Sequence, residues 1–229
     1  YRNERYRELM NEDRYVGGSI HNDLKYGAKI LFHLVPAQHG MGMSQIDPVK
    51  LKPILKMNKA LEKSFSIWEL SFEGLRAIDL GPQGFNYALR GQMLVSRDGT
   101  TELILGDYDY PNGNEGSLHT AYEEDLVEVT RALLQTYKEH QIQPPFFAFL
   151  TVHSFVGKKL YSRRQESFRQ PRGEISRDPM MIPPVVFQEY DANIPEVLKA
   201  LFDPVWNECG EASSWNYDEQ GNWRGGIYD

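Results

Sequence analysis

Seven cationic residues occur close together in the sequence, between positions 158 and 177. Only Glu166 and Glu174 carry negative charge in that interval, so its local charge is +5, seven minus two, in a chain with a formal net charge of −7. With Tyr161 and Phe168 interleaved, such a run is able to follow a phosphate backbone while a ring stacks on a base. The candidate nucleic-acid-binding residues are Lys158, Lys159, Arg163, Arg164, Arg169, Arg172 and Arg177.

The same basic run is compatible with two structural roles, and we favour these over nucleic-acid contact. It fits a solvated hairpin, and it fits a surface that docks on an acidic neighbouring domain. Its aromatic residues are too sparse to strengthen the case for nucleic acid. Direct binding of DNA or RNA through residues 158–177 is therefore the alternative prediction.

A group of oxygen-bearing side chains in the loop 107–117 raises the question of a metal site. The Asp-x-Asp start of this loop is followed by Tyr110 and Pro111, and its glycine and distal glutamate have the wrong offsets for an EF-hand. Turn-forming residues before a helix account better for this composition. A nuclease that used Asp107 or Asp109 with Lys158 or Lys159 stays as a further alternative.

The histidines and the single cysteine do not indicate catalysis either. His33 and His39 lack a third metal ligand at useful spacing, and we expect His33 to be satisfied by a backbone carbonyl at a strand edge. Cys209 is expected to pack as a small apolar residue. No phosphate-binding glycine loop, nucleophile elbow or zinc motif occurs. The sequence predicts no catalytic residue, no metal and no cofactor.

The composition is ordinary for a soluble globular protein, with 41% hydrophobic and 25% charged residues among 229. A single cysteine excludes an internal disulfide framework and fits a cytoplasmic location. No apolar run approaches the roughly 20 residues of a membrane span. The chain begins at Tyr1 rather than at methionine. We therefore expect the chain to be an excerpt or a processed fragment of a longer protein.

The element expected to organise the fold lies between Thr120 and Val152. Thr120 and Glu123 have capping-box spacing, and apolar residues then recur at helical steps. The proline pair at 144 and 145 ends this helix. The apolar stretch from Phe146 to Val152 follows, as a central strand would. This unit is a scaffold, and its strand leads directly towards Lys158.

The N-terminal half predicts a charged helix, a strand and an antiparallel meander. Tyr1 to Arg14 has few apolar positions, typical of a solvated helix with one packed edge. Ala28 to Val35 is a strand covered on both faces, and Asp47-Pro48 begins a helix. Ser66 to Gly106 is the meander, with a hairpin at Arg97-Asp98-Gly99 and a bulge at Gly91.

The C-terminal part predicts a second packed helix and an aromatic tail. The helix begins at the N-cap Asn193, and Pro204 is expected to kink or divide it. We divide the chain into a helical connector at 1–18, one domain at 19–211 and a tail at 212–229 packed on the domain. The fold class is α+β, with a mixed, mostly antiparallel β-sheet packed by the long central helix and the C-terminal helix.

Three stretches carry a family resemblance: Ala28–Pro36, the helix with Pro144–Thr151, and Phe202–Asn207 followed by Asn216–Trp223. Together they resemble the region C-terminal to the Schlafen/AlbA-type DNA-binding domain of bacterial proteins. The resemblance implies a nucleic-acid-handling domain before Tyr1, with the junction at residues 1–14. It supplies a context and carries no catalytic motif to these residues.

The preferred prediction is a non-catalytic accessory domain that senses a signal or binds a partner for the upstream Schlafen/AlbA-type domain of the same chain. Direct nucleic-acid binding through 158–177 is the alternative, and an unrecognised nuclease or hydrolase is the further one. Assembly into a homo-oligomer is left open, and no membrane partner is expected.

Overall fold

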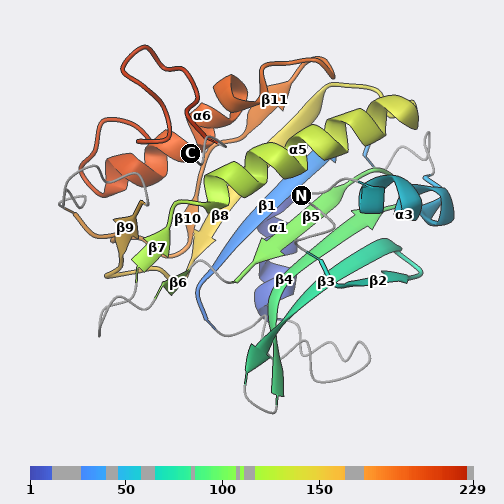
Figure 1. The fold of residues 1–229 in the computed structure, drawn as a ribbon, viewed down its shortest axis with the longest axis horizontal. Coiled ribbons are helices and arrows are strands. Elements are labelled where there is room, and N and C mark those ends of the chain that lie inside the picture. Colours follow the sequence, from blue (N-terminus) through green and yellow to red (C-terminus); the bar gives the residue numbers. More distant parts are fainter. Residues whose placement is uncertain are drawn as a thin grey trace.

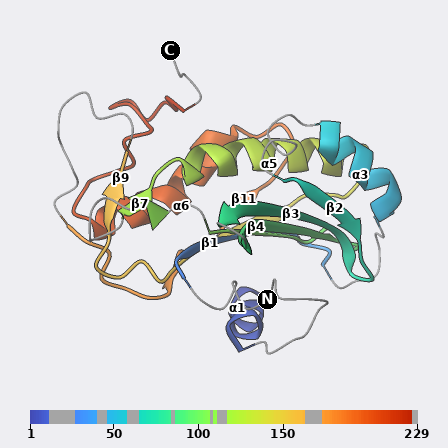
Figure 2. The same cartoon turned by 60° about the horizontal axis from the view of Figure 1, so that its bottom comes forward.

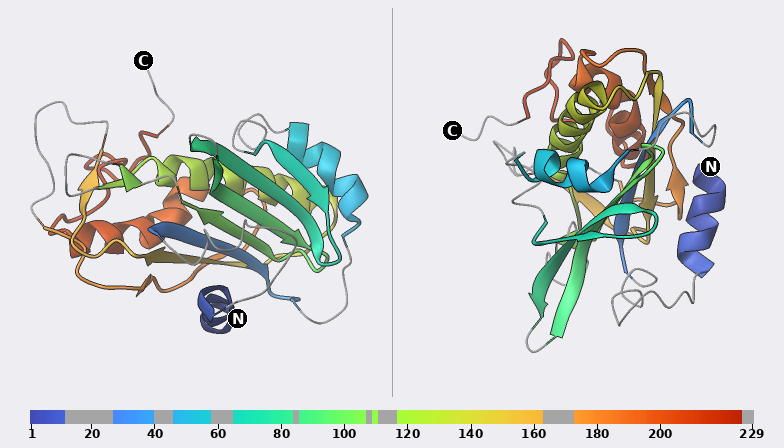
Figure 3. Two further views of the ribbon diagram at one scale, coloured as in Figure 1. Left: turned by 90° about the horizontal axis from the view of Figure 1, so that it is seen from below. Right: turned by 90° about the vertical axis from the view of Figure 1, so that its right-hand side faces the viewer.

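An antiparallel sheet with helices on both faces forms the body of the protein, which confirms the α+β class (Figures 1 and 2). The computed structural model describes residues 1–11, 27–39, 46–57, 65–83, 86–106, 109–110, 117–162 and 173–225. One face of the sheet is covered by α3 (Pro48–Met57), α5 (Tyr122–Glu139) and α6 (Ile194–Glu208). Helix α1 (Arg2–Asn11) lies on the opposite face (Figure 3).

The main sheet has eight described strands, and all of its adjoining pairs are antiparallel. The order across it is β10-β8-β1-β5-β4-β3-β2, and β11 also pairs with β8. The strands are β1 (Lys29–Pro36), β2 (Ile67–Leu70), β3 (Gly74–Gln83), β4 (Asn86–Ser96), β5 (Thr101–Leu105), β8 (Phe146–His153), β10 (Met180–Met181) and β11 (Val185–Phe187).

Strand β1 is an interior strand of this sheet, between β8 and β5, and its apolar sequence predicted that both of its faces are covered. Every one of its eight residues is buried. Alternate side chains point to opposite faces. Ile30, Phe32 and Leu34 join the large core under α5 and α6, whereas Leu31 packs with Leu9 of α1. Both faces of β1 are therefore covered, but by different layers.

A second, three-stranded sheet contains the parallel pairing of the fold. It consists of β6 (Asp109–Tyr110), β7 (Ser117–His119) and β9 (Lys159–Tyr161). Strand β7 pairs antiparallel with β6 and parallel with β9. Strand β7 immediately precedes α5, and β9 lies in the basic run at residues 158–177. The small sheet therefore connects the start of α5 to this basic run.

The antiparallel meander from β2 to β5 is confirmed. Arg97, Asp98 and Gly99 form the turn between β4 and β5, and Gly99 has a φ of 86°. The register between β3 and β4 shifts between Asp79 and Leu80, opposite Gly91 and Leu89. The extra residue on β4 is therefore adjacent to Gly91, where the bulge was expected.

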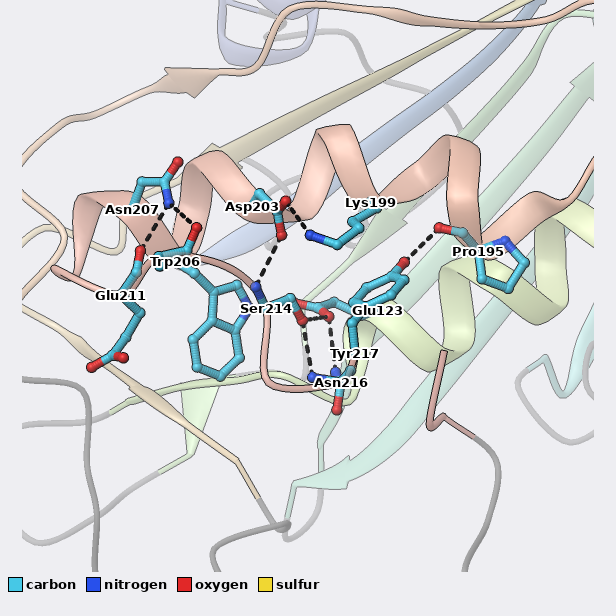
Figure 4. A network of polar contacts seen from close by, with 11 residues as sticks. Glu123, Pro195, Lys199, Asp203, Trp206, Asn207, Glu211, Ser214, Asn216 and Tyr217 are labelled. Atoms are coloured by element: carbon cyan, nitrogen blue, oxygen red, sulfur yellow. Dashed lines mark hydrogen bonds and ion pairs between the residues drawn. The ribbon is translucent and has the colours of Figure 1, made fainter. Parts of the chain in front are cut away.

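The start of α5 differs from the sequence prediction. Ala121 is the N-cap and makes no side-chain cap bond, so the capping box of Thr120 and Glu123 does not form. The Glu123 carboxylate instead accepts bonds from Trp206 Nε1 at 2.6 Å, Ser214 Oγ at 2.6 Å and Asn216 Nδ2 at 2.9 Å (Figure 4). A buried carboxylate can take several donors at once, and here those donors come from α6 and the tail.

The aromatic tail lies against α6 through ring contacts and this network. The Trp215 and Trp206 ring centroids are 5.1 Å apart, and those of Tyr217 and Trp223 are 4.9 Å apart. Tyr217 Oη also donates to the Pro195 carbonyl at 2.6 Å (Figure 4). The described part of the tail is thus held by both apolar burial and directed hydrogen bonds.

Helix α6 begins where expected and continues through its internal proline. Asn193 is the N-cap, although its side chain makes no cap bond and donates to Glu196 instead. Pro204 does not divide the helix, which runs from Ile194 to Glu208. Its apolar side, including Leu201 and Phe202, is fully buried, so packing holds the helix together across the missing backbone donor.

The start of α3 matches its sequence signal, because Asp47 Oδ1 accepts the Val49 N–H at 3.0 Å. Among the described helices, none combines the length and the apolar character needed to cross a membrane.

Candidate functional site

Three of the seven basic residues predicted to bind nucleic acid lie within the described chain. Each of the three contacts an acidic or aromatic side chain nearby. Lys159 pairs with Glu174 at 3.9 Å, and Arg177 pairs with Glu208 at 3.6 Å. The Lys158 ammonium lies 5.4 Å from the centroid of the Phe155 ring. Arg163, Arg164, Arg169 and Arg172 lie outside the described residues. Each of these three described residues thus has an acidic or aromatic neighbour, and nucleic-acid contact by this segment stays a prediction.

Polar chemistry gathers instead on the sheet face that α1 covers. Directly opposed residues of antiparallel strands share a face. His33 is opposite Glu102 and Leu31 is opposite Ile104 across β1 and β5. Across β1 and β8, Lys29 is opposite His153 and Leu31 is opposite Thr151. We call this set the α1 face: Lys29, Leu31, His33, Glu102, Ile104, Thr151 and His153.

Glu102 is the buried charge at the middle of the α1 face, with a relative exposure of 2%. Arg5 of α1 donates to it through Nε at 2.7 Å and Nη2 at 3.0 Å, a two-point contact. His33 Nε2 lies 3.2 Å from the same carboxylate. Burial raises the pKa of Glu102, but the bonds from His33 and Arg5 outweigh it and bring the pKa to about 2. The Glu102 carboxylate is thus ionised, and Arg5 is the cation that balances its buried charge.

The environment of His33 corrects its sequence interpretation. We expected a backbone carbonyl as its partner, but the ring contacts the Glu102 side chain, and its Nδ1 is buried without a partner among the described residues. The edge of the Tyr1 ring packs against the His33 ring, with centroids 5.6 Å apart. His33 therefore belongs to a charged cluster under α1.

His153 forms a second polar cluster at the end of β8. Its Nδ1 lies 2.8 Å from Tyr6 Oη of α1 and 3.2 Å from Asp178 Oδ1. Its Nε2 lies 3.0 Å from Ser154 Oγ. Burial lowers the pKa of His153, and the positive charge of Lys29 acts in the same direction, whereas Asp178 opposes them. The docked helix therefore favours neutral imidazole.

The chain of contacts from Asp178 through His153 to Ser154 has the connectivity of a nucleophile triad, and its details argue against catalysis. Tyr6 makes the shorter contact to Nδ1. A nucleophile also needs backbone N–H donors for an oxyanion, and the Ser154 N–H already donates to Asp178 at 2.7 Å. Ser154 has a φ of 60°, and this bond to Asp178 accounts for the turn. We assign no catalytic role here.

Lys29 and Thr151 complete the α1 face as buried polar groups without partners among the described residues. Lys29 is 3% exposed, and its Nζ has no hydrogen-bond partner in this part of the chain. Burial lowers the pKa of Lys29 to about 8. Thr151 is fully buried, and its Oγ1 likewise has no described partner. Such groups are costly to bury without a partner, which makes Lys29 and Thr151 candidates for a binding site.

No group of three or more His, Cys, Asp or Glu residues suited to a metal ion occurs among the described residues. Of the residues considered for a nuclease, Asp107 lies outside the described chain. Asp109 is in β6 and Lys159 is in β9, with β7 between them. A nuclease stays an untested alternative.

Sequence reasoning missed the residues of the α1 face, although one signal was present. Lys29 and Glu102 are charged residues at the ends of strongly apolar strands. A charge at a position where strand alternation predicts burial indicates a partner or a site. The cluster around His153 offered no such signal, because Tyr6 and Asp178 approach His153 from separate parts of the chain.

Comparison with known proteins adds no relative. A scan against protein-family models, a search of the curated proteins and a search of the solved structures find no match to this chain.

Proposed function

We propose that this domain is an accessory module that reversibly docks the helical connector α1 and so senses or transmits a signal for the domain to which the connector leads. The sequence resemblance suggests a Schlafen/AlbA-type nucleic-acid-handling domain in that role. The observation that carries the proposal is the chemistry that holds α1 on the sheet.

Helix α1 is held by polar contacts far more than by apolar burial. Among residues 2–10, Leu9 alone is buried, with Tyr6 and Met10 partly buried beside it. Arg5 binds Glu102, Tyr6 contacts His153, and Arg2 donates to the Ile182 carbonyl. The Arg2 guanidinium also lies 5.6 Å from the centroid of the Phe149 ring. This is the composition of a transient interface rather than of an obligate one.

Energetics support reversible docking. When a helix is released, its polar groups replace their protein partners with water, so the net loss of free energy is small. Exposing buried apolar surface to water is not compensated in this way. A helix of ten residues is marginal on its own in water. Release of α1 should therefore cost much less free energy than global unfolding, since the core between the sheet and α5 remains intact.

The test compares two arginines on the same helix. Arg5 binds Glu102, whereas Arg7 is exposed and makes no hydrogen bond or ion pair with the described residues. We expect Arg5→Gln to raise amide hydrogen exchange in residues 2–10 by about 10- to 100-fold, the loss expected for hydrogen bonds to a buried charge. Arg7→Gln is the matched control and should leave exchange near wild type.

Two results support the proposal together: faster exchange of α1 in Arg5→Gln alone, and exchange of α1 in the wild type well before that of β1 and β8. If α1 and the sheet exchange together in a single global step in all three proteins, α1 is a permanent part of the fold and reversible docking is wrong.

A further inference from the structure

The Lys29 ammonium is buried but has no counterion among the described residues. It is 3% exposed and has no hydrogen-bond partner in that part of the chain. A buried unpaired charge is among the most unfavourable features of a folded protein. Methionine would fill a similar volume without that penalty, so packing alone does not explain a lysine at this position.

The groups around Lys29 define what the missing counterion should be. Lys29 is opposite His153, which places Thr151 at the diagonal position on the same face. Diagonal side chains on an antiparallel pair lie within reach of one another. The Thr151 hydroxyl is buried and also without a partner among the described residues. An ammonium and a hydroxyl side by side match the two oxygens of a carboxylate.

Charge on the α1 face favours a monoanion. Glu102 is already paired with Arg5 and His33, and Asp178 lies against His153. Both carboxylates therefore already have partners. Lys29 is the cation of the α1 face that has no paired anion among the described residues. A phosphate dianion would bring more negative charge than one lysine can neutralise, whereas a single carboxylate would balance it.

We propose that Lys29 and Thr151 form a binding site for the carboxylate group of a small organic acid, reached when α1 leaves the sheet. The inference rests on the proposed reversible docking of α1, because the docked helix covers this face.

The site is coupled to α1 through His153. The positive charge of Lys29 helps to keep His153 neutral, and the unprotonated Nδ1 of neutral His153 can accept a hydrogen bond from the Tyr6 hydroxyl. A bound carboxylate cancels that charge and favours protonation of His153. Nδ1 then carries a proton, and the Asp178 carboxylate is a stronger acceptor for it than a phenol oxygen. Acid binding and α1 docking therefore oppose each other, and the coupling is reciprocal.

The experiment titrates the full chain with sodium acetate, using sodium chloride at equal ionic strength as the reference. Two readouts are taken from each sample: the side-chain NMR titration of Lys29, and the amide exchange of residues 2–10. We expect acetate to raise the pKa of Lys29 by about one unit and to speed exchange of α1 severalfold. Acetate should speed α1 exchange equally in Lys56→Met, which removes an exposed lysine of α3, but not in Lys29→Met.

Each outcome decides between the two proposals. A Lys29 titration that is identical in acetate and chloride overturns the carboxylate site, even if Arg5→Gln still releases α1. Acetate binding at Lys29 with no change in α1 exchange supports a carboxylate site at Lys29 but overturns the statement that the site is reached only when α1 leaves the sheet. Inorganic phosphate that binds Lys29 more tightly than acetate overturns the choice of a monocarboxylate.

Discussion

Glu102 and Glu123 are both buried carboxylates, and their neighbours drive their pKa values in opposite directions. Glu102 is bonded by the cation Arg5 and by His33, and its pKa falls to about 2. Glu123 is surrounded by neutral donors, so burial raises its pKa to about 7 against three bonds that lower it. The first carboxylate holds a helix through charge, whereas the second holds the tail through directed hydrogen bonds.

Replacing Glu123 by glutamine tests the second role. Trp206 N–H points at one oxygen of Glu123, and an Asn216 N–H points at the other. Whichever way the glutamine amide turns, its NH2 group faces a donor. We expect Glu123→Gln to lower the free energy of unfolding by about 1–3 kcal/mol, measured by denaturant unfolding followed by tryptophan fluorescence.

The matched control for Glu123 is Glu128→Gln on the same helix. Glu128 makes an exposed pair with Arg131, so its loss should cost less than about 1 kcal/mol. Equal destabilisation by the two substitutions would contradict the structural role of the Glu123 network.

His153 predicts a pH dependence for the docking of α1. Its pKa in the docked state is lowered from 6.5 by burial, so the released state binds more protons. Docking is therefore complete above about pH 6.5 and weakens as the pH falls through the lower, docked-state pKa. Amide exchange of residues 2–10, corrected for the intrinsic pH effect, should rise as the pH falls below about 6.5.

Two of the groups that face His153, Lys29 and Tyr6, titrate outside that window. Tyr6 lies against His153 from α1, Asp178 from the segment before β10 and Lys29 from β1. The pKa of Lys29 is about 8 and that of Tyr6 is raised above 10 by burial, so both titrate at higher pH. His153→Gln should flatten the profile, and a profile that keeps its slope in this variant would exclude His153 as the titrating group.

At the scale of elements, local sequence signals predicted most of the helices and strands. The stripe of α5, the apolar run of β8 and the Asp-Gly turn before β5 each depend on neighbours within a few residues. Helix α1 also behaves as expected, with one packed edge at Tyr6, Leu9 and Met10. The failure at Thr120 and Glu123 has a distant cause, because Trp206 and Asn216 supply the partners of Glu123.

The α1 face shows why the candidate site was harder to predict than the elements. Lys29 is opposite His153, and Arg5 binds Glu102, across more than ninety residues of chain in each case. No periodicity encodes such pairs, since each depends on which strands become neighbours. The sequence did show charged residues in apolar strands, and those were the available pointers to a site.

At the scale of the whole molecule, the main sheet separates the domain into two layers of unequal size. The layer under α5 and α6 contains the large apolar core, whereas the α1 layer has a small apolar cluster and buried charge. Stability thus resides on one face of the sheet. Under the proposed function, the opposite face releases and binds α1 without global unfolding, as a docking surface requires.

Whole-molecule electrostatics lead to the last prediction, that this domain does not bind DNA or RNA on its own. The net charge is −7, and two of the three described basic residues of 158–177 are paired with glutamates. We expect fluorescence anisotropy to show no binding of duplex DNA or single-stranded RNA at about 150 mM salt. Binding that weakens steeply with salt and disappears in Arg163→Glu/Arg164→Glu would establish the alternative function. The control Lys50→Glu/Lys56→Glu alters net charge equally on α3, so a similar loss there would mean that the effect is one of total charge.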